Sequence, residues 1–421
     1  MRLTPLSEPV QATVSIPGSK SYTNRALLMA AISGNCRIEN PLDSEDTVAM
    51  QSCLETLGVR FRRDTHSIEV LNSFKTSKDE VYELDANISG TTLRFLLPVI
   101  CAIPGTKILG GKEGLNKRPI GDLVDAVRQL GAHVEYQQAE GFPPLRILPV
   151  PTHSGVVRAN GTVSSQYISA LLLSAPLLEG GVIIEVEGEQ ISKPYIDMTI
   201  DSMRQFGVGV INEDYRRYIV QGGEQYTTGN YVVEGDVSSA SYFAAIATLT
   251  KSRITLTNLN PSSKQADMHF FEILAKMGTR VSKGENEMIF QGNGVLPLEV
   301  DMENCPDQAQ TLAVLAAFAD GVTKITGVRS LRVKETERVK AVEQELAKMG
   351  IRTESTQDTL TIYGGNPKPT TIDTYGDHRM AMAFAVAGTA LDGMEINNPE
   401  VAAKTFPDFW EKLRLIGVTA E

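Results

Sequence analysis

The sequence predicts an α/β protein of two similar domains, each built from three copies of one small module. Three observations support this fold class. The chain has 421 residues, which exceeds the size at which a single hydrophobic core stops growing. Its composition, 42% hydrophobic and 22% charged, is typical of ordinary globular proteins. One pattern of helix, glycine and strand recurs six times along the chain, and such regular recurrence is the signature of an internal repeat.

The recurring joint is an amphipathic helix that ends in an apolar residue and is followed by glycine and a strand-like run. In residues 122–130, for example, Leu123, Val124, Val127 and Leu130 share one helical face. Glycine just past a helix takes the left-handed conformation that ends it. Successive glycines are 73, 76, 71, 72 and 67 residues apart, so we expect modules longer than solenoid repeats. The six joints are Leu57-Gly58-Val59, Leu130-Gly131-Ala132, Phe206-Gly207-Val208, Met277-Gly278-Thr279, Met349-Gly350-Ile351 and Ile416-Gly417-Val418.

Two segments are expected to connect the domains. Val233–Ser239 lies between the third and fourth joints, and the strand Ala12–Ile16 runs directly into a Pro-Gly turn. We therefore predict an N-terminal domain of residues 18–234 and a C-terminal domain of residues 1–17 plus 235–421. Two connections of this kind form a hinge, which allows domains to close over a ligand and exclude water.

Composition excludes several classes of function. The net charge of −11 argues against nonspecific binding to nucleic acid or anionic membranes, although not against a local basic pocket. The longest apolar runs, such as Phe95–Gly105, are about half the length that spans a bilayer, and the start Met1–Pro5 has no apolar signal core. The four cysteines form no CxxC pair and the five histidines show no metal-ligand spacing. We therefore expect a cytoplasmic protein with buried thiols and no metal site. We also expect a monomer that uses no cofactor.

The segment Pro17–Arg25 is the clearest candidate for an anion site. A strand meets a Pro-Gly turn and then a helix start rich in serine and threonine, whose free N–H groups and dipole favour an anion. Ser21 and Arg25 are four residues apart and hence on one helical face, while Lys20 precedes them in the turn. The alternative interpretation is an ordinary helix cap with solvated charges.

Other basic residues also lie next to turns or helix starts, away from any run of surface lysines. Planar arginine forks, lysine charges and hydroxyls are the mixture that phosphate and carboxylate recognition requires. Ser164, Ser165 and Gln166 precede the apolar run 170–173, where ordinary N-capping is an equally good interpretation, and Ser192–Tyr195 is typical of a turn. The basic residues are Arg94, Arg118, Arg332, Lys334, Arg338, Arg379 and Lys404.

Taken together and in this order, these segments resemble the EPSP synthase family over about residues 10 to 410. The resemblance implies two domains, each of three βαβαββ units with helices packed inward, an inside-out α/β barrel. It also implies transfer of the enolpyruvyl group of phosphoenolpyruvate to the 5-hydroxyl of shikimate 3-phosphate, with release of phosphate, in the shikimate pathway of aromatic amino acid biosynthesis. The matching segments are Pro17–Arg25, Lys117–Gly121, Ser164–Gln166, Ser192–Tyr195, Glu234–Asp236, Arg332–Arg338, Asp377–Met382 and Lys404–Asp408.

The resemblance also implies which residues bind each substrate. For phosphoenolpyruvate these are Lys20, Arg118, Arg338, Arg379 and Lys404, with the backbone of Gly90 approaching the phosphate because glycine has no Cβ. For shikimate 3-phosphate they are Ser21, Arg25, Ser164, Ser165, Gln166, Ser192, Tyr195 and Lys334. The half of the site that begins at Lys20 is expected to meet the half between Asp307 and Lys404 when the domains close.

The reaction needs both an acid and a base, because the hydroxyl loses a proton while the methylene carbon gains one. Asp307 matches the family's candidate base, and Glu335 and Lys20 match its candidates for proton exchange with the methylene. Without the family, Asp307 is typical of a helix N-cap before Ala309, and Glu335 of a surface residue in a salt bridge. For His378 we favour an orienting hydrogen bond over proton transfer.

Three positions depart from the family pattern. Ile88 stands where an asparagine is expected, Phe95 where many relatives have proline, and Ser330 where an asparagine usually contacts the shikimate ring. An apolar side chain cannot supply the missing amide, so we expect weakened binding of glyphosate, unless Asn87 takes over that role. Two other functions stay open: a UDP-N-acetylglucosamine enolpyruvyltransferase, whose expected Lys-Asn start and loop cysteine are missing, and a catalytically inactive anion-binding protein of the same fold.

Overall fold

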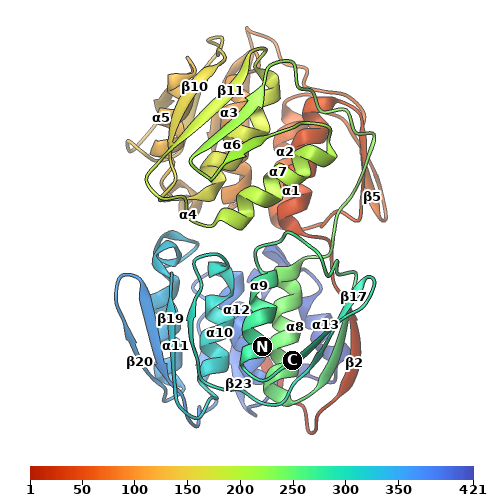
Figure 1. The fold of residues 1–421 in the computed structure, drawn as a ribbon, viewed down its shortest axis with the longest axis vertical. Helices are drawn as coiled ribbons and strands as arrows, with labels where there is room; N and C mark the ends of the chain where they lie inside the picture. The colour runs from red at the N-terminus through yellow and green to blue at the C-terminus, as the bar shows by residue number, and fades with distance from the viewer. The chain divides into compact units, whose positions relative to one another are not determined.

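The computed structural model describes all 421 residues, which form two compact units. Unit 2 comprises Gly18–Val233, and unit 1 comprises Met1–Pro17 with Glu234–Glu421. Each unit has its own hydrophobic core. In both units of Figure 1 the helices are gathered together and the sheets lie around them.

Each unit contains three four-stranded sheets, all with the same topology. The first two strands of every sheet run parallel, and the remaining pairings are antiparallel. The sheets of unit 2 have the orders β14 (Asn230–Val232)-β3 (Cys36–Glu39)-β5 (Ser67–Val70)-β4 (Phe61–Asp64), β6 (Val81–Asp85)-β7 (Thr106–Gly110)-β9 (Leu145–Leu148)-β8 (His133–Tyr136) and β10 (Gly155–Asn160)-β11 (Gly181–Glu187)-β13 (Arg217–Gln221)-β12 (Ile211–Glu213).

In unit 1 the N-terminal segment completes two of the three sheets. Strand β2 pairs in parallel with β15, with Val14 opposite Leu256, and β1 lies between β23 and β24. The orders are β2 (Gln11–Ser15)-β15 (Arg253–Thr257)-β17 (Glu287–Gln291)-β16 (Arg280–Lys283), β18 (Glu299–Asp301)-β19 (Val322–Thr326)-β21 (Thr359–Tyr363)-β20 (Arg352–Ser355) and β22 (Thr371–Ile372)-β23 (Met394–Ile396)-β1 (Arg2–Thr4)-β24 (Thr419–Ala420).

Three helices fill the centre of each unit, and nearly every one of their residues is buried. A helix that is buried on all sides needs small or apolar residues all round rather than one apolar stripe, and the alanines of α8, α10 and α12 satisfy this requirement. The central helices are α1 (Lys20–Ser33), α3 (Gly90–Cys101) and α6 (Ser165–Ser174) in unit 2, and α8 (Val237–Thr250), α10 (Ala309–Ala316) and α12 (His378–Gly388) in unit 1.

The second helix of each module is amphipathic and ends at one of the predicted joints. All six joint glycines have left-handed φ values, between 80° and 109°, and a strand follows each of them, so the repeat prediction is confirmed. These helices are α2 (Glu45–Thr56), α5 (Gly121–Gln129), α7 (Lys193–Gln205), α9 (Met268–Lys276), α11 (Arg338–Lys348) and α13 (Phe409–Leu415). The short elements are α4 (Glu113–Asn116), η1 (Ala175–Leu177), η2 (Pro306–Gln308), η3 (Arg329–Val333) and η4 (Pro399–Lys404).

Two further predictions concern the whole chain. All four cysteines are buried and free, as expected for structural thiols. None of the helices combines the length and hydropathy that crossing a membrane requires.

Candidate functional site

Arg25 of α1 is held inside unit 2. Its guanidinium donates to the Thr199 hydroxyl at 2.9 Å and to the Tyr195 carbonyl at 3.1 Å, and lies 5.0 Å from the centre of the Phe95 ring. Burial lowers the pKa of Arg25 to about 10. Ser19 caps α1 as the alternative interpretation of this segment expected, but the charge of Arg25 is buried rather than solvated. The carbonyl of Ser21 also accepts from this guanidinium, at 3.0 Å.

Lys20 is the first residue of α1, where the sequence placed it in the preceding turn. Its ammonium lies 3.1 Å from a carboxylate oxygen of the buried Asp46, in the first turn of α2. The sequence analysis missed Asp46. The serine-capped start of α2, with its two acidic residues, was the available signal, because acids are favoured in the first turn of a helix.

The start of α3 brings two arginines together. A Cβ on Gly90 would lie 2.9 Å from an Nη atom of Arg118 and 3.2 Å from one of Arg94, so any other residue would push the ends of these two side chains away. Arg94 donates to the Gln166 side chain at 2.7 Å. Gly90, Arg118 and Gln166 thus gather at the N-terminal ends of α3 and α6, with Arg94 linking them.

The polar residues before α6 and α7 have different local roles. Ser164 caps α6 by accepting from the N–H of Gln166 at 3.3 Å, and Ser165 is the first helical residue. The expectation of a turn at Ser192–Tyr195 is wrong beyond its first residue, because α7 begins at Lys193. Ser192 has a left-handed φ of 52°, an uncommon conformation for a non-glycine residue.

In unit 1 the guanidinium of Arg338 is bound by three carboxylates. Arg338 is 1% exposed, and its donors reach Asp377 at 2.7 Å, Asp307 at 3.0 Å and Glu335 at 2.8 Å. Burial alone would lower the pKa of Arg338, but the three carboxylates raise it above its ordinary value. A planar fork with several donors is suited to this arrangement, whereas lysine is not.

Asp307 binds cations rather than capping a helix. Its carboxylate accepts from Arg379 at 3.0 Å and lies 3.6 Å from the Lys334 ammonium. Burial alone would raise the pKa of this carboxyl, but Arg379, Lys334 and Arg338 together lower the pKa well below its ordinary value. The N-cap interpretation is wrong because Asp307 lies in η2, and Gln308 precedes the first residue of α10.

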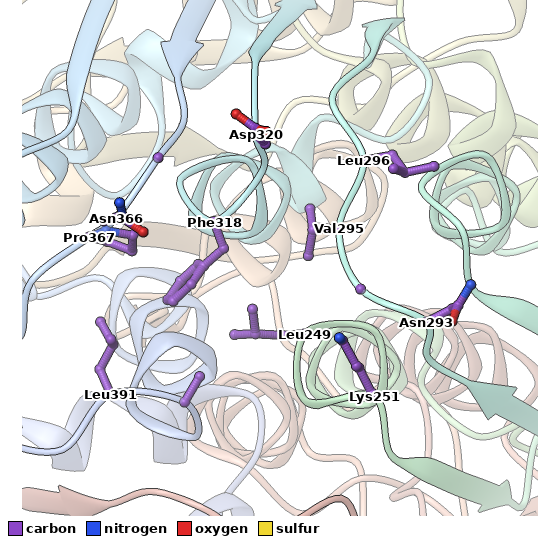
Figure 2. A pocket seen from close by; sticks show the side chains of 13 residues that line it. Leu249, Lys251, Asn293, Val295, Leu296, Phe318, Asp320, Asn366, Pro367 and Leu391 are labelled. Carbon is purple, nitrogen blue, oxygen red and sulfur yellow. The ribbon is translucent and has the colours of Figure 1, made fainter.

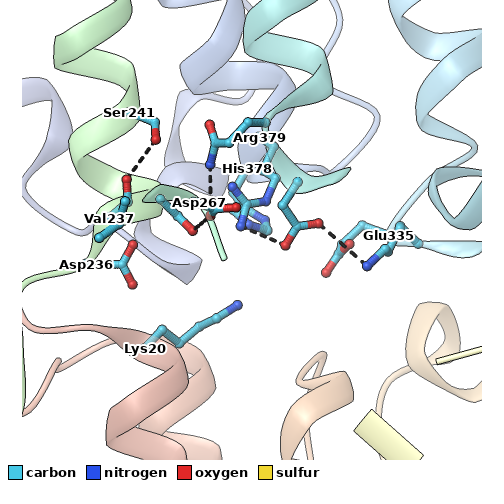
Figure 3. A network of polar contacts seen from close by, with 12 residues as sticks. Lys20, Asp236, Val237, Ser241, Asp267, Glu335, His378 and Arg379 are labelled. Carbon is cyan, nitrogen blue, oxygen red and sulfur yellow. Dashed lines mark hydrogen bonds and ion pairs between the residues drawn. The ribbon is translucent and has the colours of Figure 1, made fainter. Parts of the chain in front are cut away.

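Glu335 bridges two buried cations. One oxygen accepts from Arg338, and the other from Lys404 at 2.8 Å. The alternative interpretation of Glu335 is therefore right about the salt bridge but wrong about the surface, because only 14% of its side chain is exposed and Lys404 is 3% exposed. Ser330 lies in η3, four residues before Lys334. In Figure 3, Asp267, Arg379 and Glu335 belong to one polar network of this unit.

Asp377 is the second charged residue that was not predicted from the sequence. It caps α12 by accepting from the N–H of Arg379 at 2.8 Å, and its other oxygen binds Arg338. An aspartate directly before an apolar helix was the available signal. His378 is the first residue of α12 and is buried, with its Nδ1 3.6 Å from the Asp377 carboxylate.

A separate cavity of about 570 Å³ lies at the other end of the central helices of unit 1. Figure 2 shows its lining side chains, among them Leu249, Lys251, Phe318, Asp320 and Leu391. These residues follow or end α8, α10 and α12, whereas Asp307 and Arg379 lie at the starts of α10 and α12. None of the predicted site residues lines this cavity. It is therefore distinct from the charged cluster of Asp307, Lys334, Glu335, Arg338, Arg379 and Lys404.

The comparison with protein families decides the assignment of the chain. A model of EPSP synthase (3-phosphoshikimate 1-carboxyvinyltransferase) matches residues 6–413. The chain belongs to this family. It is 41% identical to the 3-phosphoshikimate 1-carboxyvinyltransferase of Vibrio atlanticus over 98% of both chains. The Vibrio cholerae enzyme of the same name is 42% identical over 96% of both. The sequence-based assignment as an EPSP synthase-type transferase is therefore confirmed, and the UDP-N-acetylglucosamine alternative is not favoured.

The fold prediction is confirmed by solved structures. An EPSP synthase from Acinetobacter baumannii superimposes with a TM-score of 0.81, covering 100% of this chain and 99% of that one. Sequence identity in this comparison is 24%. The shared fold is the two-domain arrangement of α/β modules with inward helices.

Proposed function

We propose that this EPSP synthase acts through the charged cluster of unit 1 and the basic residues of unit 2 described above. The reaction moves the enolpyruvyl group of phosphoenolpyruvate to the 5-hydroxyl of shikimate 3-phosphate and releases phosphate. The observation that carries the proposal is the set of cations around Asp307 and Glu335: Arg338, Arg379 and Lys404, which are buried, and the half-buried Lys334. Burying so many charges is costly unless they serve one another or a charged ligand.

Phosphoenolpyruvate carries a phosphate and a carboxylate, and both groups need cationic or N–H donors. Arg338, Arg379 and Lys404 are proposed to bind it from unit 1. From unit 2 we propose Lys20 and Arg118, and the N–H groups at the start of α3 near Gly90. Helix starts and arginine forks are the donors that phosphate and carboxylate groups prefer.

Shikimate 3-phosphate is proposed to bind mainly to unit 2. Arg25 is held by hydrogen bonds and by Phe95, so it can meet a phosphate without first losing side-chain entropy. The remaining proposed contacts are Ser21, Ser164, Ser165, Gln166, Ser192 and Tyr195 from unit 2 and Ser330, Lys334 and Asp307 from unit 1.

The proton transfers are proposed to involve Asp307, Glu335 and Lys20. Asp307 has a pKa far too low for an efficient base at neutral pH while three cations surround it. When an anionic substrate draws Arg338 and Arg379 to itself, their effect on Asp307 weakens and its basicity rises. The substrate itself therefore activates the carboxylate that takes the hydroxyl proton, and Glu335 or Lys20 exchanges the proton of the methylene carbon.

The decisive experiment measures phosphate release from phosphoenolpyruvate by the purified chain. Release is expected only when shikimate 3-phosphate is also present, with the enolpyruvyl ether product identified by NMR. UDP-N-acetylglucosamine serves as the control acceptor and should give no phosphate. Binding of both substrates without turnover would favour the catalytically inactive alternative and overturn the proposal.

We also propose that the chain works as a cytoplasmic monomer. The single chain supplies every residue invoked above, so no second copy is required. Light scattering coupled to size exclusion should give a mass near 45.8 kDa. A stable dimer would contradict the monomeric state. Recovery of the native protein outside the cytoplasmic fraction would contradict the cytoplasmic location.

A further inference from the structure

Asp267 is a buried carboxyl that neither the family resemblance nor the charged cluster explains. It is 3% exposed and directly precedes α9. An aspartate at this position usually caps its own helix, yet its side chain makes no capping bond. Its carboxylate is used elsewhere.

The carboxylate joins two other elements of unit 1. One oxygen accepts from the hydroxyl of Ser238 at the start of α8 and from the Gln308 side chain at 3.1 Å. Gln308 is fully buried and directly follows Asp307 in η2. Asp267 is thus the carboxyl that ties the Asp307 turn to the starts of α8 and α9 (Figure 3).

The turn that carries Asp307 needs such a support. η2 is a single 3₁₀ turn of three residues, closed by the Gln308 N–H to the Cys305 carbonyl at 3.1 Å. Short 3₁₀ turns have poorer hydrogen-bond geometry than α-helices. The hydrogen bond from Gln308 to Asp267 gives this turn a buried anchor one residue from Asp307.

The electrostatic environment agrees with a role that depends on hydrogen bonding. Burial raises the pKa of Asp267, Arg379 opposes this effect and Asp307 adds to it. The second carboxyl oxygen of Asp267 is buried and has no hydrogen-bond partner. An amide of the same shape could keep the acceptor toward Gln308 and Ser238 while removing the charge.

We propose that Asp267 is a positioning residue for the proposed enolpyruvyl transfer: through Gln308 it holds the turn that aims Asp307 at Arg338 and Arg379. Asp267 itself makes no hydrogen bond to Arg338 and is not among the proposed substrate contacts. This inference rests on the proposed function of Asp307. It adds a structural support, contributed by another module, to the carboxylate at the centre of the cluster.

The test compares Asp267→Asn, Asp267→Ala and Gln308→Leu. Losing a hydrogen bond to a charged group should lower kcat/KM about 10- to 100-fold in the alanine and leucine variants. Asp267→Asn should stay within about threefold of wild type because it keeps the acceptor. Ser241→Ala is the matched control, since its hydroxyl donates only within α8, to the Val237 carbonyl at 2.8 Å. Figure 3 shows this neighbouring pair.

The pH profile separates positioning from general stability. Arg379, Lys334 and Arg338 lower the pKa of Asp307, while Glu335 and Asp267 face it with like charge. In Gln308→Leu, Asp307 is no longer held toward its cations, while Glu335 and Asp267 remain. The pKa of Asp307 should therefore rise, and the fall of kcat/KM at acid pH should begin at higher pH. In Asp267→Asn, Asp307 keeps its orientation, so the fall of kcat/KM at acid pH should stay where it is or move to lower pH.

Three outcomes would overturn the proposal. The first is wild-type kinetics in Gln308→Leu. The second is an equal loss of kcat/KM in Asp267→Asn and Asp267→Ala. The third is a fall of kcat/KM at acid pH that begins at higher pH in Asp267→Asn than in wild type. Gln308→Leu decides the matter even where Asp267→Ala fails to fold. If wild type shows no turnover, the proposed function fails separately. Calorimetry with phosphoenolpyruvate then tests the positioning, because weaker binding by Gln308→Leu supports it and equal binding contradicts it.

Discussion

Asn40 and Asn258 hold the same place in the two units. Each follows a central strand, β3 or β15, with a left-handed φ of 54° or 60°. The Asn40 amide donates to the Val233 carbonyl at 2.8 Å, and the Asn258 amide donates to the Ile16 carbonyl at 2.7 Å. In each unit, therefore, an asparagine holds the last residues of that unit before a connection.

The backbone of these asparagines explains two glycines of the connections. A Cβ on Gly18 would lie 2.1 Å from the Asn40 carbonyl oxygen, and one on Gly235 would lie 1.7 Å from that of Asn258. Such contacts are possible only for glycine. Both connections are thus clamped by an asparagine side chain and a close backbone approach.

Replacing Gly235 by alanine should destabilise unit 1. The new methyl group must displace the backbone of Asn258. Overpacking of this kind lowers the free energy of unfolding by about 1–3 kcal/mol or more. Gly365→Ala is the matched control, because nothing lies within 4 Å of its Cβ position. Thermal unfolding should show a clearly lower melting temperature for Gly235→Ala and an unchanged one for Gly365→Ala. Equal melting temperatures would contradict the clamp.

Arg338→Lys should abolish most of the activity although it keeps the charge. One ammonium cannot satisfy Asp307, Glu335 and Asp377 together. Leaving a buried carboxylate unpaired costs about 3–5 kcal/mol, so both stability and kcat/KM should fall strongly. Arg352→Lys is the control, since Arg352 is exposed and pairs only at the surface. Steady-state kinetics and urea unfolding of the two variants provide the measurement.

Lys20→Met should abolish turnover while the fold stays intact. The substitution removes the charge at the start of α1 but keeps the length of the side chain. The buried Asp46 loses its 3.1 Å ion pair, so the melting temperature should fall although the protein still folds. Lys78→Met, at an exposed lysine of the same unit, should retain full activity. Circular dichroism checks the fold. Activity of Lys20→Met within about tenfold of wild type would remove Lys20 from the mechanism.

Asp307 should contribute an acid-sensitive part of the stability. Its folded pKa lies well below the ordinary value, since the surrounding cations outweigh the effect of burial. Such a group stabilises the fold above the unfolded pKa of about 4, and this stabilisation is lost as the pH falls toward the folded pKa. Denaturant unfolding of wild type and Asp307→Asn at neutral pH and near pH 3 measures the effect. The variant should lose less stability on acidification than wild type.

The sequence predicted the repeat because its signals are local. A glycine after an amphipathic helix specifies a helix end without reference to the rest of the fold, and all six joints have the expected conformation. Strand β1 has only three residues, too few for a periodic pattern. Its place between β23 and β24 depends on the whole of unit 1 and could not be predicted in this way.

The cations of the site could be predicted, but not their partners. Lys20, Arg338 and Arg379 were recognisable from helix starts and from the family resemblance. Asp46 and Asp377 lie 26 and 39 residues from the cations that they bind, and only tertiary folding brings them close. Asp307 resembled an N-cap because a 3₁₀ turn before α10 leaves no local sign that its carboxylate points elsewhere.

Ile88→Asn should strengthen inhibition by glyphosate. Ile88 is half-buried and lies two residues before Gly90, at the start of α3 where the proposed phosphoenolpyruvate contacts gather. Its apolar side chain offers no hydrogen bond to the amine of glyphosate, whereas asparagine does. The neighbouring Asn87 is fixed in a left-handed conformation, with its N–H bound to the Asp85 side chain at 2.7 Å.

The measurement is the glyphosate inhibition constant against phosphoenolpyruvate. A new hydrogen bond should lower it about 3- to 10-fold in Ile88→Asn. Ile88→Leu, which keeps an apolar side chain of the same size, should behave as wild type. The same constant for wild type and Ile88→Asn would show that position 88 does not set the sensitivity. Phe95, which is fully buried beneath Arg25, would then be the remaining departure from the family in this helix.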